Sequence, residues 1–86
     1  MDLQTLTLAL KRLMIEELDL RGKTPEQIDE QAPLFGAGLG LDSLDALQLA
    51  MAVEERFAVR VPEGDEGRAA FASVQALAEF IRARAG

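Results

Sequence analysis

Apolar residues recur at helical spacing over the first twenty positions of the chain. Residues three or four apart share one face of a helix, and five such positions are apolar here: Leu3, Leu6, Leu10, Leu13 and Met14. Charged residues such as Lys11 and Glu16 lie mostly elsewhere on the turn. We therefore expect a first helix over residues 2 to about 20. Gly22 is predicted to cap its C-terminus, because glycine adopts the left-handed conformation without strain.

A second helix is expected over residues 43–57, with apolar residues on two opposite faces. At about 100° per residue, one face groups the residues expected in the core: Ala46, Leu49, Ala50, Val53 and Phe57. The opposite face groups Leu44, Leu47 and Met51, and polar residues flank it: Asp45, Gln48, Glu54 and Glu55. A central helix buried on both sides has the same pattern. Because only part of a helix can be buried twice in so small a chain, we expect this second face to meet partner proteins.

The rest of the chain predicts two shorter elements and a long connection. Thr24 and Pro25 resemble a helix start with a cap and a proline at the first position, and residues 21–41 are otherwise expected to form a loop. A third, short helix is predicted around residues 65–71, and Ser73 is predicted to cap a last helix. Residues 57–62 read as an extended connection. These elements together predict an all-α fold.

Composition and charge limit the classes of partner that this chain is expected to bind. Its 86 residues suit one small domain, spanning residues 1–86, and they include no cysteine and no histidine. The net charge of −6 disfavours nucleic acid and anionic membrane surfaces. No stretch approaches the roughly 18 apolar residues of a membrane span, so we expect a cytoplasmic protein. Between residues 25 and 55 there is no lysine or arginine, which predicts a docking face for basic partners around residue 43.

Ser43 is the residue whose chemistry stands out. A serine nucleophile needs a base within hydrogen-bond reach, and the chain has no histidine and only Lys11 and Lys23 as lysines. Serine before an apolar helix is most often an N-cap. A phosphate ester at Ser43 is also physically reasonable, because free N–H groups and the helix dipole stabilise an anion there. The alternatives at this point are therefore a helix cap and a site of covalent modification.

The residues around Ser43 resemble the phosphopantetheine attachment motif of acyl carrier proteins. The similarity covers most of the chain, and its most specific part is the run Leu-Gly-Leu-Asp-Ser-Leu-Asp. It is carried by residues 35–45, 54–57, 61–62 and 73–77. The resemblance implies a four-helix bundle with three longer helices, one short helix and a long loop after the first. It also implies that a phosphopantetheinyl transferase attaches 4′-phosphopantetheine from coenzyme A to Ser43, with Asp42 assisting the transfer.

The same resemblance implies a carrier without catalytic activity of its own. Acyl groups would be held as thioesters on the arm and presented to fatty-acid or polyketide-type enzymes: ketosynthase, acyltransferase or ligase, ketoreductase and dehydratase. The expected docking residues are those of the second stripe and its flanks: Leu44, Asp45, Leu47, Gln48, Met51, Glu54 and Glu55. We expect no nucleic acid partner, no metal site and a monomer when the chain is alone.

This chain departs from the common carrier pattern at several positions. Gln48 stands where an acidic residue is frequent, and residues 37–38 replace residues that are often acidic. The segment 63–68 is slightly longer than in fatty-acid carriers. These departures favour a specialised pathway, such as aryl-polyene or type II polyketide synthesis. A peptidyl or aminoacyl carrier and a helical adaptor that is no carrier remain the alternatives.

Small residues on or near the expected core faces suggest room for an acyl chain between the helices. They are Ala46, Ala50, Ala69, Ala70, Ala72, Ala76 and Ala78. Apolar cargo bound inside so small a core is expected to raise thermal stability.

Overall fold

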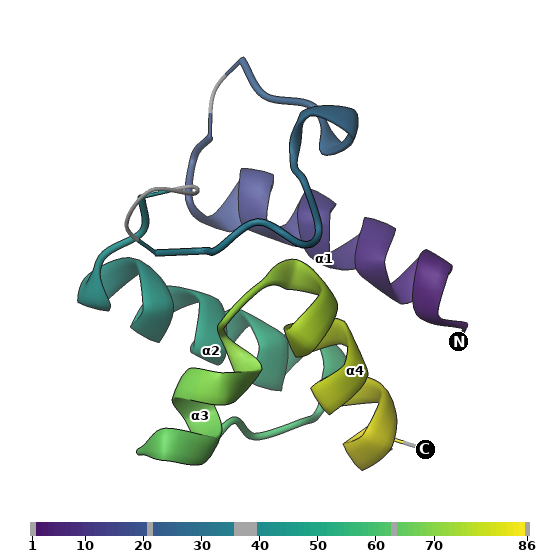
Figure 1. Cartoon of the computed structure of the whole chain (residues 1–86), viewed down its shortest axis with the longest axis vertical. Helices are drawn as coiled ribbons and strands as arrows, with labels where there is room; N and C mark the ends of the chain where they lie inside the picture. The colour runs from purple at the N-terminus through teal and green to yellow at the C-terminus, as the bar shows by residue number, and fades with distance from the viewer. Residues whose placement is uncertain (1, 21, 36–39, 63, 86) are drawn as a thin grey trace.

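The computed structural model describes residues 2–20, 22–35, 40–62 and 64–85 and is all-helical over them (Figure 1). The elements in chain order are α1 (Leu3–Glu17), the 3₁₀ turn η1 (Pro25–Gln27), α2 (Ser43–Phe57), α3 (Asp65–Ala70) and α4 (Val74–Ala85). Three longer helices, one short helix and a long connection after the first helix confirm the predicted fold class. The radius of gyration is 11.6 Å.

Helix α1 begins where the sequence predicts and ends earlier. Asp2 is its N-cap, since an Asp2 carboxylate oxygen accepts a 2.7 Å hydrogen bond from the Thr5 amide. The helix ends at Glu17, and Asp19 takes the left-handed conformation at φ 53°. The Leu20 amide then bonds back to the Ile15 carbonyl at 3.1 Å, as in a Schellman motif. The prediction of Gly22 as the cap is wrong, because aspartate tolerates the left-handed region and takes that position three residues earlier.

The long connection between α1 and α2 is anchored to the rest of the molecule by buried side chains and backbone bonds. Ile28, Leu34 and Leu41 are buried in the core. The Leu34 amide bonds the Ala72 carbonyl at 3.2 Å, and the Gln75 amide bonds the Glu30 carbonyl at 2.9 Å. These contacts fix the connection against the start of α4. The chain therefore enters α2 from a defined position.

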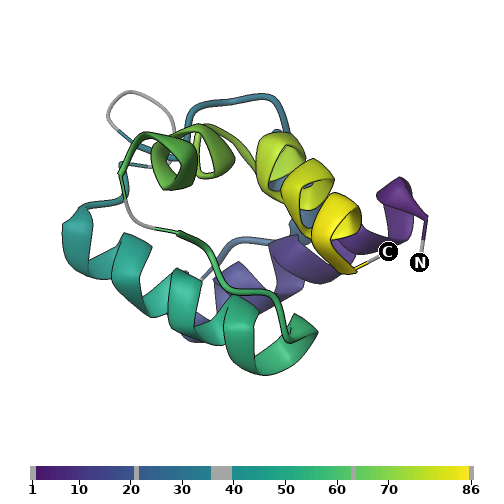
Figure 2. The same ribbon diagram turned by 90° about the horizontal axis from the view of Figure 1, so that it is seen from below.

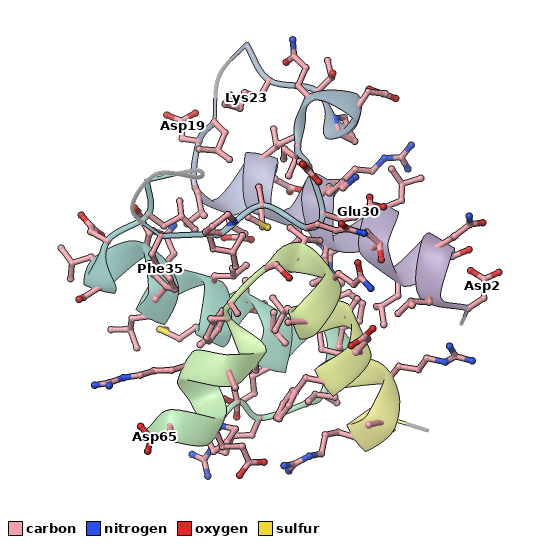
Figure 3. All side chains as sticks on the ribbon, in the orientation of Figure 1. Asp2, Asp19, Lys23, Glu30, Phe35 and Asp65 are labelled. Carbon is pink, nitrogen blue, oxygen red and sulfur yellow. The ribbon has the colours of Figure 1, made fainter. Side chains whose placement is uncertain are left out.

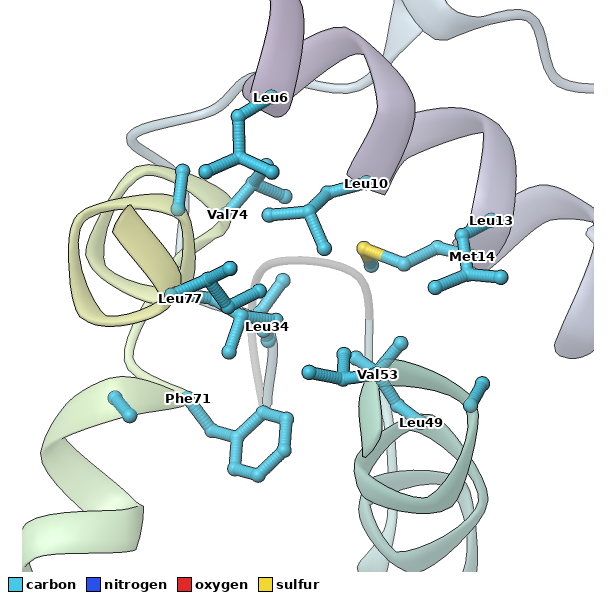
Figure 4. Packing of buried hydrophobic residues seen from close by; sticks show 14 of the residues in the cluster. Leu6, Leu10, Leu13, Met14, Leu34, Leu49, Val53, Phe71, Val74 and Leu77 are labelled. Atoms are coloured by element: carbon cyan, nitrogen blue, oxygen red, sulfur yellow. The ribbon is translucent and has the colours of Figure 1, made fainter. Parts of the chain in front are cut away.

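The core lies between α1, α2 and α4 and is almost wholly aliphatic (Figure 4). Helix α1 contributes Leu6, Leu10, Leu13 and Met14 of its predicted face, while Leu3 is only half-buried. Helix α4 contributes Val74, Leu77, Ala78 and Ile81, which are spaced for one helical face. In Figure 2, α1 and α2 lie on one side of the molecule and α3 and α4 on the other. The N-terminal end of α1 and the C-terminal end of α4 lie close together in both views.

The core face of α2 differs in part from the prediction. Leu49 and Val53 are fully buried, as expected, but Ala52 is buried as well. Ala46, Ala50 and Phe57 are only half-buried. The inward stripe is therefore turned toward Ala52, which lines one pocket together with Leu13 and Glu17 of α1.

The remaining boundaries agree with the sequence. The Ser73 hydroxyl accepts a 3.0 Å hydrogen bond from the Ala76 amide and so caps α4 as predicted. Ala58 ends α2 in the left-handed conformation at φ 57°, and residues 59–62 form a connection with no helix or strand. In the described part of the chain the sole β-type pairing is an isolated parallel bridge between Phe35 and Leu41.

Candidate functional site

The first turn of α2 is closed by two aspartates rather than by the serine between them. An Asp42 carboxylate oxygen accepts from the Asp45 amide at 2.9 Å, and an Asp45 carboxylate oxygen accepts from the Asp42 amide at 3.1 Å. This reciprocal pair is a capping box with Asp42 as the N-cap. Ser43 is therefore the first helical residue, and the prediction that it could serve as the cap is not what the structure shows.

Ser43 is exposed at the start of α2. Within the described residues, its hydroxyl takes part in no hydrogen bond, since Asp42 and Asp45 satisfy the cap between them. The amides of the first helical turn have no partner inside a helix. The hydroxyl thus lies where the positive end of the helix dipole favours an attached anion.

The approach to Ser43 is held by the end of the long connection. The Leu41 amide donates to the Leu34 carbonyl at 3.0 Å, and the Leu41 side chain is buried. Gly40 has φ +72°, a left-handed conformation that glycine adopts without strain. The other glycines of the motif, Gly36 and Gly38, lie outside the described residues. Leu41 therefore fixes the backbone two residues before the serine.

The second apolar stripe of α2 is exposed, as predicted from the helical wheel. Leu44, Leu47 and Met51 have 75%, 58% and 62% of their surface accessible. Such values are high for large apolar side chains in a chain this small, and a contiguous apolar patch rimmed by polar residues marks an interaction surface. Glu54 and Glu55 on this helix are exposed and Asp45 is half-buried. We call Leu44, Leu47 and Met51 with these acids the docking stripe.

Gln48 has a second role that sequence reasoning missed. Its side-chain amide donates a hydrogen bond to the backbone carbonyl of Glu17, the last residue of α1. That carbonyl belongs to the helix end, where acceptors lack partners within the helix. Gln48 therefore ties α2 to the C-terminus of α1 while its residue surface remains exposed.

A cavity of about 690 Å³ opens beside Ser43, between α2 and α3. Ser43 and Ala46 line it from α2, Arg68 and Phe71 from α3 and its C-cap, and Phe35 from the long connection. Figure 3 shows Phe35 beside the first part of α2. The size lies within the range of small-molecule sites. A ligand attached at Ser43 would have this cavity within immediate reach.

Helix α3 is held close to the cavity rim by Gly67. A Cβ atom at Gly67 would lie 2.0 Å from the Pro62 carbonyl oxygen, and Gly67 itself is buried. Only glycine permits this approach of helix backbone to loop backbone. The lining residues Phe35, Gly67 and Arg68 were not predicted, because each comes from a segment whose spatial neighbour cannot be read from local pattern.

The predicted set of small residues is confirmed in part. Ala70 and Ala78 are buried, and Ala46 lines the cavity. Ala69 and Ala72 are exposed and do not belong to a core face. Their assignment was wrong because α3 is only six residues long and packs through Gly67, Ala70 and Phe71.

A second groove of about 350 Å³ runs along the docking stripe and is lined by Leu47, Met51 and Glu54 of α2 and by Arg60. Arg60 adds a cation to a surface that sequence reasoning treated as acidic alone. No helix in the described part of the chain is long and apolar enough to cross a lipid bilayer.

Comparison with known proteins identifies the family. A family model described as a phosphopantetheine attachment site matches residues 9–81. The acyl carrier protein of Wolinella succinogenes is 35% identical over 72 residues, covering 84% of this chain and 87% of that protein. The acyl carrier protein of a Sulfurovum species is 35% identical over 72 residues, covering 84% of this chain and 88% of that protein. The chain therefore belongs to the acyl carrier protein family, whose function rests on 4′-phosphopantetheine as its cofactor.

Proposed function

We propose that Ser43 is the attachment residue and that the chain carries acyl groups as thioesters on an arm fixed there. The observation that supports this most is the division of roles in the first turn of α2. Asp42 and Asp45 close the cap, so the Ser43 hydroxyl is exposed and makes no hydrogen bond within the described residues. A serine that capped the helix would have its oxygen engaged with its own backbone.

The residues around Ser43 fit a phosphodiester. Attachment forms a bond between the Ser43 oxygen and phosphorus, releases the adenosine bisphosphate part of coenzyme A and frees the hydroxyl proton. The helix start favours the charge that results. Asp42 keeps one carboxylate oxygen on the Asp45 amide and has its other oxygen available for the transferase's metal ion. The arm supplies a thiol, which the chain lacks because it has no cysteine.

The docking stripe supports contacts with several enzymes in turn. Its apolar side chains offer a core for a partner interface, and Glu54 and Glu55 favour partners with a basic rim. We propose the transferase first and then ketosynthase, acyltransferase or ligase, ketoreductase and dehydratase as these partners. Weak, electrostatically steered contacts suit a carrier that must leave each enzyme.

A specialised pathway, of the aryl-polyene or type II polyketide kind, is our proposal for the cargo chemistry. Gln48 bonds to α1 and adds no charge to the docking stripe, while Arg60 adds a cation next to it. The cavity beside Ser43 is lined by the phenyl rings of Phe35 and Phe71. Aromatic side chains favour flat or unsaturated groups through ring contacts.

The test of attachment uses the chain's two serines, Ser43 and Ser73. The protein is incubated with coenzyme A and a transferase of broad specificity, and intact mass and fragment masses are recorded. The wild type is expected to gain one phosphopantetheine on the peptide that contains Ser43. Ser43→Ala is expected to gain none, and the control Ser73→Asn, which retains a good capping residue, is expected to be labelled. Absence of label on the wild type with several transferases would refute the proposal.

A helical adaptor that is no carrier is the second candidate, because the docking stripe alone could bind a partner helix. Ser43→Ala and Leu47→Glu separate the two. Leu47 is 58% exposed, so its substitution leaves the core intact. A carrier loses function with either change, whereas an adaptor keeps function with Ser43→Ala. A peptidyl or aminoacyl carrier would instead be recognised by loading with an amino acid by its ligase.

A further inference from the structure

One cation lies at the rim of the cavity beside Ser43, whose other described lining residues are uncharged. Among its described lining residues, Arg68 is the sole charged one, and Ser43 is the sole uncharged residue with a polar side chain. Phe35 and Phe71 supply the largest apolar surfaces. A guanidinium at such a rim has little to interact with inside the cavity unless a ligand brings an acceptor.

Within the described residues, the Arg68 side chain is held only weakly. Its ion-pair partner is Asp65, one turn earlier on α3, with 4.0 Å between a guanidinium nitrogen and a carboxylate oxygen. Both side chains are largely exposed. Exposed pairs of this kind contribute little, so exchanging Asp65 for another oxyanion costs little. Arg68 is therefore available for a ligand in the cavity.

The backbone that carries Arg68 is well fixed. Gly67, its neighbour, lies against the Pro62 carbonyl, and the Phe71 amide bonds the Gly67 carbonyl at 3.0 Å. A hydrogen-bonded ion pair of Glu66 with Arg84 joins α3 to α4. Phe71 lines the cavity and is buried in the core (Figure 4). Arg68 thus lies at a defined place on the cavity rim, on the element opposite Ser43.

We propose that Arg68 binds an oxyanion that the arm on Ser43 brings into this cavity, an inference that rests on the proposed function. The guanidinium presents several N–H donors in a fixed plane and pairs well with carboxylate or phosphate oxygens. The oxyanion has two sources, namely the phosphodiester at Ser43 or a carboxylate at the far end of the acyl cargo. If the cargo is the source, the chain selects dicarboxylic acyl groups over alkyl groups of equal length.

The experiment compares two cargoes of four carbons each, succinyl and butyryl, which differ in a terminal carboxylate. The full-length chain is loaded from succinyl-, butyryl- and free coenzyme A, loading is confirmed by mass, and thermal unfolding is followed. Arg68→Gln removes the cation and keeps a polar side chain. Arg82→Gln is the matched control, because Arg82 is exposed on α4 and lines none of the described cavities. The Arg82→Gln variant also removes one positive charge, but at a site away from the cavity.

With a carboxylate as the source, the succinyl form is expected to gain about 2–4 °C over the butyryl form, as for a partly exposed ion pair in a domain of this size. Arg68→Gln abolishes that gain and Arg82→Gln preserves it. With the phosphodiester as the source, Arg68→Gln lowers the melting temperature of all arm-bearing forms relative to the apo form and shifts the ³¹P resonance. Equal behaviour of Arg68→Gln and Arg82→Gln in both measurements would overturn the proposal. If the chain accepts the arm but Arg68→Gln changes neither measurement, only this inference is refuted. If the chain does not accept the arm at all, the proposed function is refuted.

Discussion

The hydrogen bond from Gln48 to the end of α1 leads to a prediction about the effect of an acidic residue at this position. Gln48→Glu keeps the size of the side chain and removes its amide donor. The Glu17 carbonyl, which accepts that bond, then faces a carboxylate. We expect this substitution to destabilise the fold, although it would add a negative charge beside the docking stripe.

The magnitude follows from two contributions. A lost hydrogen bond between neutral groups costs about 1 kcal/mol. A negative charge at a helix C-terminus opposes the dipole and costs roughly 0.5 kcal/mol at an exposed site. For a chain of 86 residues, the unfolding entropy of about 2.1 cal/mol/K per residue gives roughly 180 cal/mol/K, so a loss of about 1.5 kcal/mol lowers the melting temperature by about 8 °C.

Thermal and urea unfolding of the apo protein provide the assay, because neither needs an enzyme partner. Gln48→Met serves as the control, since it removes the donor without adding charge and is expected to cost about 1 kcal/mol. The difference between the Glu and Met variants should shrink as salt is raised. A Gln48→Glu protein as stable as the wild type would show that the contact to Glu17 contributes nothing, and the reasoning would fail.

Three further predictions concern the core, the cavity rim and the first helix. Leu49→Ala removes a fully buried side chain and should lower the free energy of unfolding by about 2–5 kcal/mol, measured in urea. Met51→Ala on the exposed stripe should change it by less than about 0.5 kcal/mol. Equal effects would contradict the assignment of the two faces. Gly67→Ala should lower the melting temperature despite alanine's better helix propensity, because its Cβ would clash with the Pro62 carbonyl oxygen. An unchanged melting temperature would show that α3 can shift to make room. The hydrogen bond from the Thr5 amide holds the pKa of Asp2 below its ordinary value of 3.8, so the bond stabilises the protein above that pH and is lost as the pH falls through the lowered pKa. Asp2→Ala should therefore lower the melting temperature at neutral pH, and a gap that persists unchanged to pH 2 would contradict this.

The helices and their buried faces were predictable because they depend on local spacing. The buried faces of α1 and α4 follow the sequence spacing, except that Leu3 is only half-buried and Thr7 is buried in α1. Ser73 caps α4 as expected. The C-terminus of α1 was not predictable in the same way. Asp19 and Gly22 both take the left-handed conformation, and sequence rules favour glycine as the residue that ends a helix. Which of two such residues ends a helix depends on where Leu18 and Leu20 pack, and that is tertiary information.

The site was predictable in its motif and not in its surroundings. The docking stripe and its exposure followed from one helical wheel, and Ser43 was singled out by its motif and its place at the start of that helix. Gln48 contacts a residue 31 positions away, and no local pattern indicates such a partner. The cavity likewise combines Phe35 with residues of α2 and α3. Alanine spacing overestimated the role of Ala69 and Ala72, because α3 is too short to bury two faces.

The first turn of α2 explains how one helix contributes to three surfaces. Leu49 and Val53 point to the core, Leu44 and Leu47 to the exposed surface, and Ala46 to the cavity. The cavity and the exposed stripe meet at the start of α2, where Ser43 and Ala46 line the cavity and Leu44 is exposed. A group attached there can turn into the cavity or out along the docking stripe without any change in the fold. A serine that carries an attached group cannot also cap the helix with its hydroxyl. Asp42, one residue earlier, caps α2 instead.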